Sequence, residues 1–581
     1  MSSATRSGDS DLTQKSLYSL LRSCQIGEAG AIVGGHIDRN DLRQELYVET
    51  DKDRRLSEFF VENYQKDGKH LIITGSAGDG KSALLSRAFK QAKQAGVELK
   101  KSYIHMDATA AMRKHQTYDD TLAKFLEAVS TCIENSAGPR TGLAINLGLA
   151  IDFFERKNYA EQYPAIWEAI DQTRSTDMYE GEDIVVINLG HRDTYNTDPS
   201  SLGEGLVGDL VEKFAFDDPA SPFHQAYSQT KERCDAPQKC PLHYNARKFT
   251  DPAVRKRVTE LIAASGIINN SYLNPRAILD IISKMIVPEE MQIVSDDGAG
   301  CPVGATARHG RYFEPNVVLW NAVFARLQGQ EDRVEGYLDP AAQAHEEIDP
   351  VILGWGAGGG KLDSIIGAVP AVSDEDLTTR VQTALRKRYL TGDSPIETAT
   401  EWSWFREFAG ALSFFNGGGD KHKTRASDAV STVQDALKGW SGRGAQNTDL
   451  IEFIDGMQGE YKFLSKWQKP MPNKEASHER TREETIPGQL WIVLQPGTSD
   501  LDIPVPVTFD LYLLMKRISA GYRPNARDLE RSEGIRLIHS RLSEFTDKRE
   551  TVRITDTSDS EVLTLERDAF DTIAVELGAE D

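Results

Sequence analysis

Long apolar segments are missing from this chain of 581 residues. No run approaches the roughly 18–20 residues that a membrane-spanning helix needs. Residues 1–14 (MSSATRSGDSDLTQ) also lack the basic start and apolar stretch of a secretory signal. Cysteine is scarce, because five cysteines in so long a chain do not make a disulfide framework. These absences argue against a membrane protein or a disulfide-rich secreted protein, and we expect a cytoplasmic one.

Positive charge is also in short supply. The chain has 67 lysines and arginines against 89 aspartates and glutamates, which gives a formal net charge of -22. This balance argues against a protein that coats nucleic acid non-specifically, although one local basic face would still permit contact with DNA. Hydrophobic residues make up 39% of the chain, and the 46 glycines bring the total near the usual share of a globular protein. The length suggests about three to five domains.

Apolar periodicity divides the chain into five segments. Residues 1–45 are interpreted as an N-terminal arm, and residues 46–215 alternate apolar strands with helical stretches, as in an α/β layered fold. Residues 216–300 are predicted to be helical, and residues 301–480 mostly helical with glycine-rich loops. Residues 481–581 are predicted to form a small α+β domain.

The C-terminal part has two further features. Residues 466–485 are polar and contain proline, which suggests a linker before the last domain. That domain is predicted to contain two strands, two helices, a hairpin and a closing helix. Residues 554–581 contain nine acidic residues and one basic residue, so this end should avoid DNA and suits a basic partner.

One motif predicts specific chemistry. Residues 70–96 have the pattern of a buried strand, a turn and an amphipathic helix, and the turn GSAGDGKS satisfies G-x-x-x-x-G-K-[ST]. Such a loop wraps a phosphate with backbone N–H groups at the positive end of the following helix. The alternative is a glycine turn that matches by chance, but the strand before it and the helix after it favour a phosphate loop. The predicted nucleotide-binding residues are Gly75, Ser76, Ala77, Gly78, Asp79, Gly80, Lys81, Ser82 and Ala83.

Two side chains of this loop have expected roles. Lys81 should reach the β- and γ-phosphates, which makes it a catalytic candidate. The Ser82 hydroxyl should ligate Mg²⁺. ATP and Mg²⁺ are therefore the expected cofactors.

An acidic partner for Mg²⁺ is harder to find. A second strand, at 100–109, ends near Asp107, which either holds Mg²⁺ through water or is a turn residue at the strand end. The place of this strand, directly after the first helix, resembles the second strand of an additional-strand, AAA+-type ATPase.

The third strand, at 142–155, departs from the AAA+ pattern. It has Asn146 and Leu147 where AAA+ proteins carry an acidic pair. Without a carboxylate there, Mg²⁺ loses an anchor and the attacking water loses its usual base. Asp152 and Glu155 follow about two turns later, too far along the chain to be assumed substitutes.

Other residues resemble the nucleotide sensors of AAA+ proteins. The strand at 182–195 has Asn188 at the position of sensor 1, which reads the γ-phosphate; the alternative is a turn former at the strand end. The segment Asn274-Pro275-Arg276 resembles sensor 2 at the start of a lid helix, although proline at a helix start is also ordinary. Asn188 and Arg276 are therefore the other catalytic candidates.

Arginine fingers and metal ligands are less clearly marked. Arg192 and Arg247 are the arginines considered as a finger for a neighbouring subunit, and neither is assigned. A cluster of Cys234, Cys240 and His243, with His224 upstream, contains zinc-ligand residue types. Its spacing fits no common zinc site, so we expect buried thiols in place of zinc.

Two glycine-rich stretches lie outside the phosphate loop. Residues 354–361 resemble a second phosphate loop but have Trp355 at the first glycine position and Leu362 in place of the hydroxyl residue. Residues 416–425 place basic side chains on a loop, either for contact with a phosphate backbone or as a solvated surface. The neighbouring aromatic residues Trp402 and Phe405 are interpreted as helix core.

Several short segments together resemble one family. They are ELYVET at 45–50, GSAGDGKS, HMDATAA at 105–111, the INLG strand end and GYRPN at 521–525, followed by Asp528. This combination is similar to the DptF (DndF) component of phosphorothioation-dependent DNA restriction systems. The family's binding residues correspond here to Gly75, Gly78, Gly80, Lys81 and Ser82.

The resemblance implies a bacterial anti-phage function. In such systems an ATPase and two partner proteins, the G and H components, damage DNA that lacks a sulfur mark in its backbone. DNA contact would occur through the complex, and an oligomer is compatible with the AAA+ pattern. The departure at Asn146 leaves three functions open: an ATPase, an ATP-gated assembly switch with little hydrolysis, and another AAA+ or STAND-type defence or signalling ATPase that acts on proteins.

The expected fold combines these features. We expect an AAA+-like P-loop NTPase core with a parallel sheet over residues 46–215, followed by a helical lid. A largely helical middle region and a small α+β domain complete the chain.

Overall fold

The computed structural model describes the following residues: 16–26, 42, 45–50, 53–54, 69–94, 96, 104–106, 108, 117–135, 141–174, 176–191, 194–233, 237, 240–288, 318–327, 338–342, 377–392, 400–417, 419–439, 450–458, 460–468, 471–483, 488–495, 502–525, 528, 534–535, 537–538, 540–541, 551–556, 560–567 and 572–577. The chain divides into two compact units. The first comprises Met1–Asn196, Leu202–Ser265 and Leu273–Pro395, and the second Thr197–Ser201, Gly266–Tyr272 and Ile396–Asp581.

The first unit is built on a five-stranded sheet. Its strands are β1 (His70–Thr74), β2 (Ile104–His105), β3 (Gly142–Ala144), β4 (Met178–Glu180) and β5 (Ile184–Asn188), in the order β2-β3-β1-β5-β4. The central strand β1 runs parallel to β3 and β5, and β2 runs parallel to β3, whereas β4 is antiparallel to β5. The predicted α/β class is therefore confirmed, with a mixed and mostly parallel sheet.

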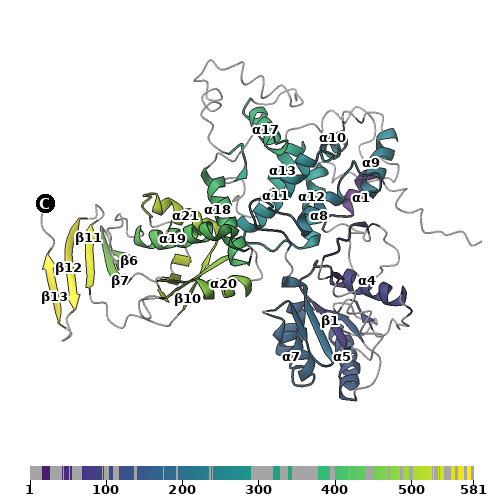
Figure 1. Ribbon diagram of the computed structural model, residues 1–581, viewed down its shortest axis with the longest axis horizontal. Coiled ribbons are helices and arrows are strands. Elements are labelled where there is room, and N and C mark those ends of the chain that lie inside the picture. Colours follow the sequence, from purple (N-terminus) through teal and green to yellow (C-terminus); the bar gives the residue numbers. More distant parts are fainter. Residues whose placement is uncertain are drawn as a thin grey trace, which may run out of the picture. The chain divides into compact units, whose positions relative to one another are not determined.

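Helices cover both faces of this sheet (Figure 1). On one face lies α4 (Lys81–Gln94), whose Leu84 and Leu85 pack on Leu71 and Ile73 of β1. On the other lie α5 (Tyr118–Glu134), α6 (Leu147–Ile151), the π-helix η3 (Asp152–Arg156) and α7 (Pro164–Gln172). Because both faces are covered, every residue of β1 and β5 is buried, and each strand contains a continuous apolar run, 71–73 in β1 and 184–187 in β5.

The strand order differs from the additional-strand arrangement. That arrangement requires another strand between the phosphate-loop strand β1 and β3, the strand expected to end in an acidic pair. Here β3 pairs directly with β1, with Leu71 opposite Gly142 and Ile73 opposite Ala144. The end of β3 therefore lies beside the first residue of the phosphate loop, and the sheet itself gives no support to the AAA+ version of the fold.

The rest of the first unit is helical in its described residues. Its helices are α1 (Leu17–Arg22), α8 (Leu206–Lys213), α9 (Pro222–Arg233), α10 (Pro241–Lys248), α11 (Pro252–Ile268), α12 (Pro275–Ile286), α13 (Leu319–Leu327) and α17 (Leu377–Leu390). α12 packs against α8 and α13, and α1 packs against α9. None of the described helices is long and apolar enough to cross a membrane.

The second unit combines helices with two antiparallel sheets. Its helices are α18 (Thr400–Phe415), η10 (Asp420–His422), α19 (Lys423–Gly439), α20 (Lys474–Glu483) and α21 (Phe509–Ser519). One sheet has the order β10-β9-β8, from β8 (Met471–Asn473), β9 (Leu490–Gln495) and β10 (Ile503–Val507). The other has the order β13-β12-β11-β7-β6, from β6 (Leu450–Gln458), β7 (Tyr461–Gln468), β11 (Thr551–Asp556), β12 (Glu561–Arg567) and β13 (Ile573–Leu577).

Three sequence predictions for this part of the chain were wrong. Residues 450–468 form the hairpin of β6 and β7 and are not helical. The predicted linker at 466–485 contains β8 and α20. The predicted closing helix is strand β13, which pairs with β12 so that Leu577 lies opposite Leu563 (Figure 1). The β6–β7 hairpin also pairs with the distant strand β11, a contact that local periodicity does not reveal.

Candidate phosphate-binding site

The predicted phosphate loop joins the end of β1 to the start of α4. Its glycines Gly75, Gly78 and Gly80 have φ values of 144°, 95° and 88°, a region that side chains rarely adopt. A Cβ on Gly75 would lie 2.6 Å from a carboxylate oxygen of Asp79, so this position is also closed sterically. The loop therefore needs glycine for its shape, and it ends at the N-terminus of a 14-residue helix.

Lys81 and Ser82 begin α4 and hold the loop together. The Lys81 ammonium donates hydrogen bonds to the carbonyls of Gly75 at 3.2 Å and Ser76 at 2.5 Å, so its charge lies over the loop. The Ser82 hydroxyl donates to the carbonyl of Met106 at 2.7 Å, directly after β2. With its hydrogen used in this way, the Ser82 oxygen keeps its lone pairs for a cation.

Asp79 braces the loop from inside. Its side chain is 1% exposed, and its carboxylate accepts a hydrogen bond from the Ser76 amide at 2.5 Å. A buried carboxylate that accepts a backbone N–H is a strong, charge-assisted contact. Asp79 thus fixes the turn, a role that the motif alone does not assign to this variable position.

The N-terminus of α12 lies against this loop. Asn274 caps α12 by accepting from the Ala277 amide at 2.8 Å, and its amide group donates to the Ala77 carbonyl at 3.2 Å. A Cβ on Gly78 would lie 2.9 Å from the Asn274 side-chain oxygen and 3.1 Å from the Cβ of Arg276. The structure therefore places the Cβ of Arg276 beside the loop, although 195 residues separate Arg276 from Lys81 in the chain. Its role as a nucleotide sensor stays a prediction.

The predicted sensor residue Asn188 lies at the end of β5 and is 1% exposed. Its side-chain oxygen accepts from the Gly190 amide at 2.9 Å, and its amide group donates to the Thr173 carbonyl at 2.8 Å. These are the contacts of a turn former, the alternative that the sequence left open. The sensor role of Asn188 stays a prediction.

Asn146, at the position expected for an acid, follows β3. It caps α6 with its side-chain oxygen, which accepts from the Gly148 amide at 2.9 Å. The next residue, Leu147, donates its amide to the carbonyl of Gly75 at 3.1 Å. The end of β3 thus contacts the first residue of the phosphate loop directly.

The chain matches no protein-family model, no curated protein and no solved structure. The site is therefore interpreted from its own geometry.

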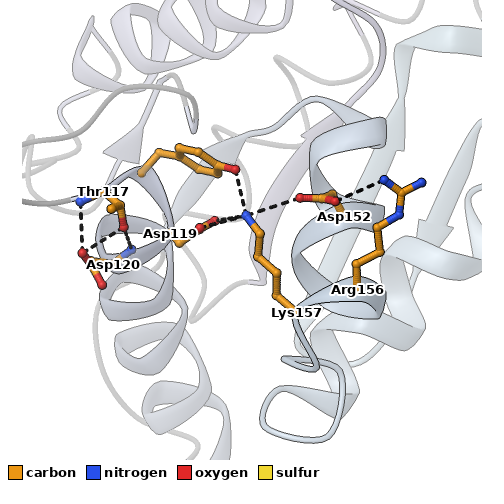
Figure 2. A network of polar contacts seen from close by, with 7 residues as sticks. Thr117, Asp119, Asp120, Asp152, Arg156 and Lys157 are labelled. Carbon is orange, nitrogen blue, oxygen red and sulfur yellow. Dashed lines mark hydrogen bonds and ion pairs between the residues drawn. The ribbon is translucent and has the colours of Figure 1, made fainter.

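Asp152 and Glu155 do not reach the loop through any described contact and are engaged elsewhere. Asp152 pairs with Arg156 and with Lys157, and Glu155 pairs with Arg174. Lys157 also donates to Asp119 at 2.8 Å and to the Tyr118 hydroxyl at 2.7 Å (Figure 2). The bond to Asp119, then that to Tyr118, raises the pKa of Lys157 above its usual range. Asp152 is thus linked through Lys157 to the start of α5, and Glu155 is linked to Arg174, which follows α7.

Some candidates from the sequence lie outside the part of the chain that the structure describes: Asp107, Arg192, Cys234 and the glycine-rich stretch 354–361. Arg247 lies on α10 and is exposed. Cys240 and His243 are buried, at 2% and 4% exposure. Among the described residues no group of three or more histidine, cysteine or acidic side chains is arranged to hold a metal ion.

The basic loop at 416–425, in the second unit, is largely paired. Lys421 donates to Asp198 at 2.8 Å, His422 lies 3.1 Å from the same carboxylate, and Arg425 lies 3.3 Å from His422. Burial alone would raise the pKa of Asp198, but hydrogen bonds from Lys421, Ser200 and His422 together hold it well below its usual range. These pairings favour a structural role for the loop over contact with a phosphate backbone.

The aromatic residues of α18 form core, as predicted. Trp402 and Phe405 are 2% and 0% exposed, and their rings stack with centroids 5.1 Å apart.

Proposed function

We propose that this chain binds ATP with Mg²⁺ at the phosphate loop of its first unit. The observation that carries the proposal is the contact between the loop and α12, through the Asn274 amide and the Ala77 carbonyl. It brings the positive ends of two helices, α4 and α12, to a loop that also holds the Lys81 ammonium. Helix N-termini and lysine both favour bound phosphate.

The residues present fit a magnesium nucleotide. Ser82 offers a hydroxyl oxygen to the cation, and the loop amides together with Lys81 face the phosphates. Arg276, whose Cβ lies beside Gly78, would supply a second positive charge. Bound Mg²⁺ would neutralise phosphate charge, while the protein residues hold and orient the nucleotide.

We also propose that the nucleotide domain is an AAA+-like variant with α12 as its lid helix. The supporting feature is the Asn274-Pro275-Arg276 segment at the phosphate loop, where the family has sensor 2. The order of β3 and β1 departs from the additional-strand pattern, so the likeness rests on the lid helix and the loop.

Hydrolysis is proposed to be slow, which makes the protein an ATP-gated switch. Strands β3 and β5 lie on either side of the loop strand β1. Asn146 follows β3 and Asn188 ends β5. Both side chains are amides, and an amide cannot act as a general base. An ATPase is the second candidate. It is favoured by Lys81 and Arg276, which can stabilise charge on transferred phosphate.

The biological setting is proposed from the sequence resemblance alone. We infer that the switch belongs to a bacterial anti-phage complex that restricts DNA lacking phosphorothioate marks, with the G and H components as partners. The net charge of -22 supports DNA contact through those partners. A STAND-type defence or signalling protein is the alternative, and failure of the assembled complex to bind DNA at low salt would favour it.

Equilibrium binding of a fluorescent ATP analogue tests the nucleotide site. Lys81→Ala removes the ammonium and should weaken binding about tenfold or more, the expected loss for a charged hydrogen bond. Lys93→Ala, an exposed lysine on the same helix, is the matched control and should bind like the wild type. Equal affinity of the wild type and Lys81→Ala would contradict the proposal.

Steady-state ATP turnover separates the switch from the ATPase. The switch predicts wild-type turnover close to the Lys81→Ala background while ATP binding stays intact. Turnover far above that background would favour the ATPase.

A further inference from the structure

The same four residues, I-N-L-G, occur twice around the phosphate loop. Residues 145–148 follow β3, and residues 187–190 follow from the end of β5. Both strands run parallel to β1 and are its two neighbours in the sheet. The repeated segments therefore emerge at the same edge of the sheet as the loop, one on each side of it.

Both segments form the same turn. In each, the asparagine oxygen accepts from the amide of the glycine two residues later, at 2.9 Å. Both turns also contact Gly75: Leu147 donates to its carbonyl, and Leu189 Cβ lies 3.3 Å from where a Gly75 Cβ would be. The chain thus places two equivalent asparagines beside the start of the phosphate loop.

The two asparagines differ in the hydrogen bonding of their side-chain amide groups. Asn188 is 1% exposed, and its amide group is committed to the Thr173 carbonyl. Asn146 is half-buried, and its amide group has no hydrogen-bond partner among the residues that the structure describes. Asn146 therefore keeps two N–H donors available, whereas Asn188 is held within the protein.

The residue after Asn146 shares a hydrogen-bond acceptor with Lys81. The carbonyl of Gly75 accepts both from the Leu147 amide at 3.1 Å and from the Lys81 ammonium at 3.2 Å. One oxygen thus links the residue after Asn146 to the group expected to contact the β- and γ-phosphates.

We propose that Asn146, and not Asn188, reads the γ-phosphate. This inference rests on the proposed nucleotide site. The Asn146 amide donates to a γ-phosphate oxygen, which ATP has and ADP lacks, while its own oxygen keeps capping α6. Asn188 is the structural copy that holds the equivalent turn on β5. Asn146 thus occupies the position expected for an acid after β3. Its role there is that of a hydrogen-bond donor that distinguishes ATP from ADP, in place of a general base.

The affinities for ATP and ADP, measured in EDTA, test the assignment. Asn146→Asp keeps the shape and the capping oxygen but removes the donor and adds a negative charge, so the fold is preserved. It should weaken ATP binding about tenfold or more and change ADP binding less, because the lost donor and the added charge both act at the γ-phosphate, which ADP lacks. Asn146→Ala should shift the ATP-to-ADP affinity ratio in the same direction, and Asn188→Ala should lower the melting temperature without changing that ratio.

Each other outcome overturns the assignment. An unchanged ratio in both Asn146 variants, with ADP bound normally, removes the γ-phosphate role and leaves the nucleotide site standing. A changed ratio in Asn188→Ala alone returns the role to Asn188. If the wild type binds neither nucleotide, in EDTA or with Mg²⁺, the proposed function fails as well, and the absence of ADP binding identifies that case.

Discussion

Arg276 shows how one residue depends on a distant element for its role. It lies two residues after the helix cap Asn274, and its Cβ is 3.1 Å from where a Cβ on Gly78 would be. Because Arg276 lies in the first turn of the helix that contacts the loop, we expect its guanidinium to contact bound phosphate.

Replacing Arg276 with alanine should therefore weaken ATP binding about tenfold, the usual order for a lost charged hydrogen bond. Equilibrium titration with ATP and Mg²⁺ measures the effect. Arg247→Ala, an exposed arginine on α10, serves as the control and should leave the affinity unchanged. Equal affinities of the wild type and Arg276→Ala would remove Arg276 from the site.

At the same scale, the sequence predicted residue types better than contacts. The motif identified Gly75, Lys81 and Ser82 because each position has a chemical requirement that is visible in the letters. It did not predict that Asp79 braces the loop, since that position varies in the motif. The repeated I-N-L-G letters were a usable signal for the paired turns, but the different surroundings of Asn146 and Asn188 emerge only from tertiary packing.

At the scale of elements, one lysine links the π-helix η3 to α5. Lys157 follows η3 and bridges Asp152 to Asp119 at the start of α5 (Figure 2). The side chains are 31%, 32% and 23% exposed, so solvent screens the pairs. Their contribution to stability should therefore be small despite the number of contacts.

Lys157→Met should accordingly lower the melting temperature by only about 1–2 °C. ATP affinity should stay at the wild-type value, because none of the described contacts of Lys157 involves the phosphate loop. Thermal unfolding and nucleotide titration of the same preparation check both parts. A large loss of ATP affinity would mean that the contacts of η3 affect the phosphate-binding site.

Helices and strands were predictable where the residue pattern within one segment was sufficient. The strand β1, its loop and α4 follow from a buried apolar run, a glycine motif and an amphipathic pattern. Strand β7 pairs with the distant strand β11, which local periodicity does not reveal, whereas β6 and β13 pair with their neighbours in the chain. For β13 all five residues are exposed, so no burial pattern marks it as a strand.

At the scale of the whole molecule, the acidic charge and the two units suggest a division of tasks. The first unit holds the candidate nucleotide site, and the net charge of -22 argues that this protein does not grip DNA broadly by itself. Division of the chain at Pro395 is not visible in local patterns, because the second unit also includes Thr197–Ser201 and Gly266–Tyr272. Such an assignment requires contacts between distant segments.

The central claim is that ATP occupies the loop beneath the start of α12. Hydrogen exchange of the full chain with and without ATP and Mg²⁺ tests it most directly, since bound phosphate protects the amides that it contacts. We predict slower exchange in peptides covering residues 75–83 and 274–279 of the wild type, and a higher ATP concentration for the same protection in Lys81→Ala. Unchanged exchange in both peptides at saturating ATP would contradict the account.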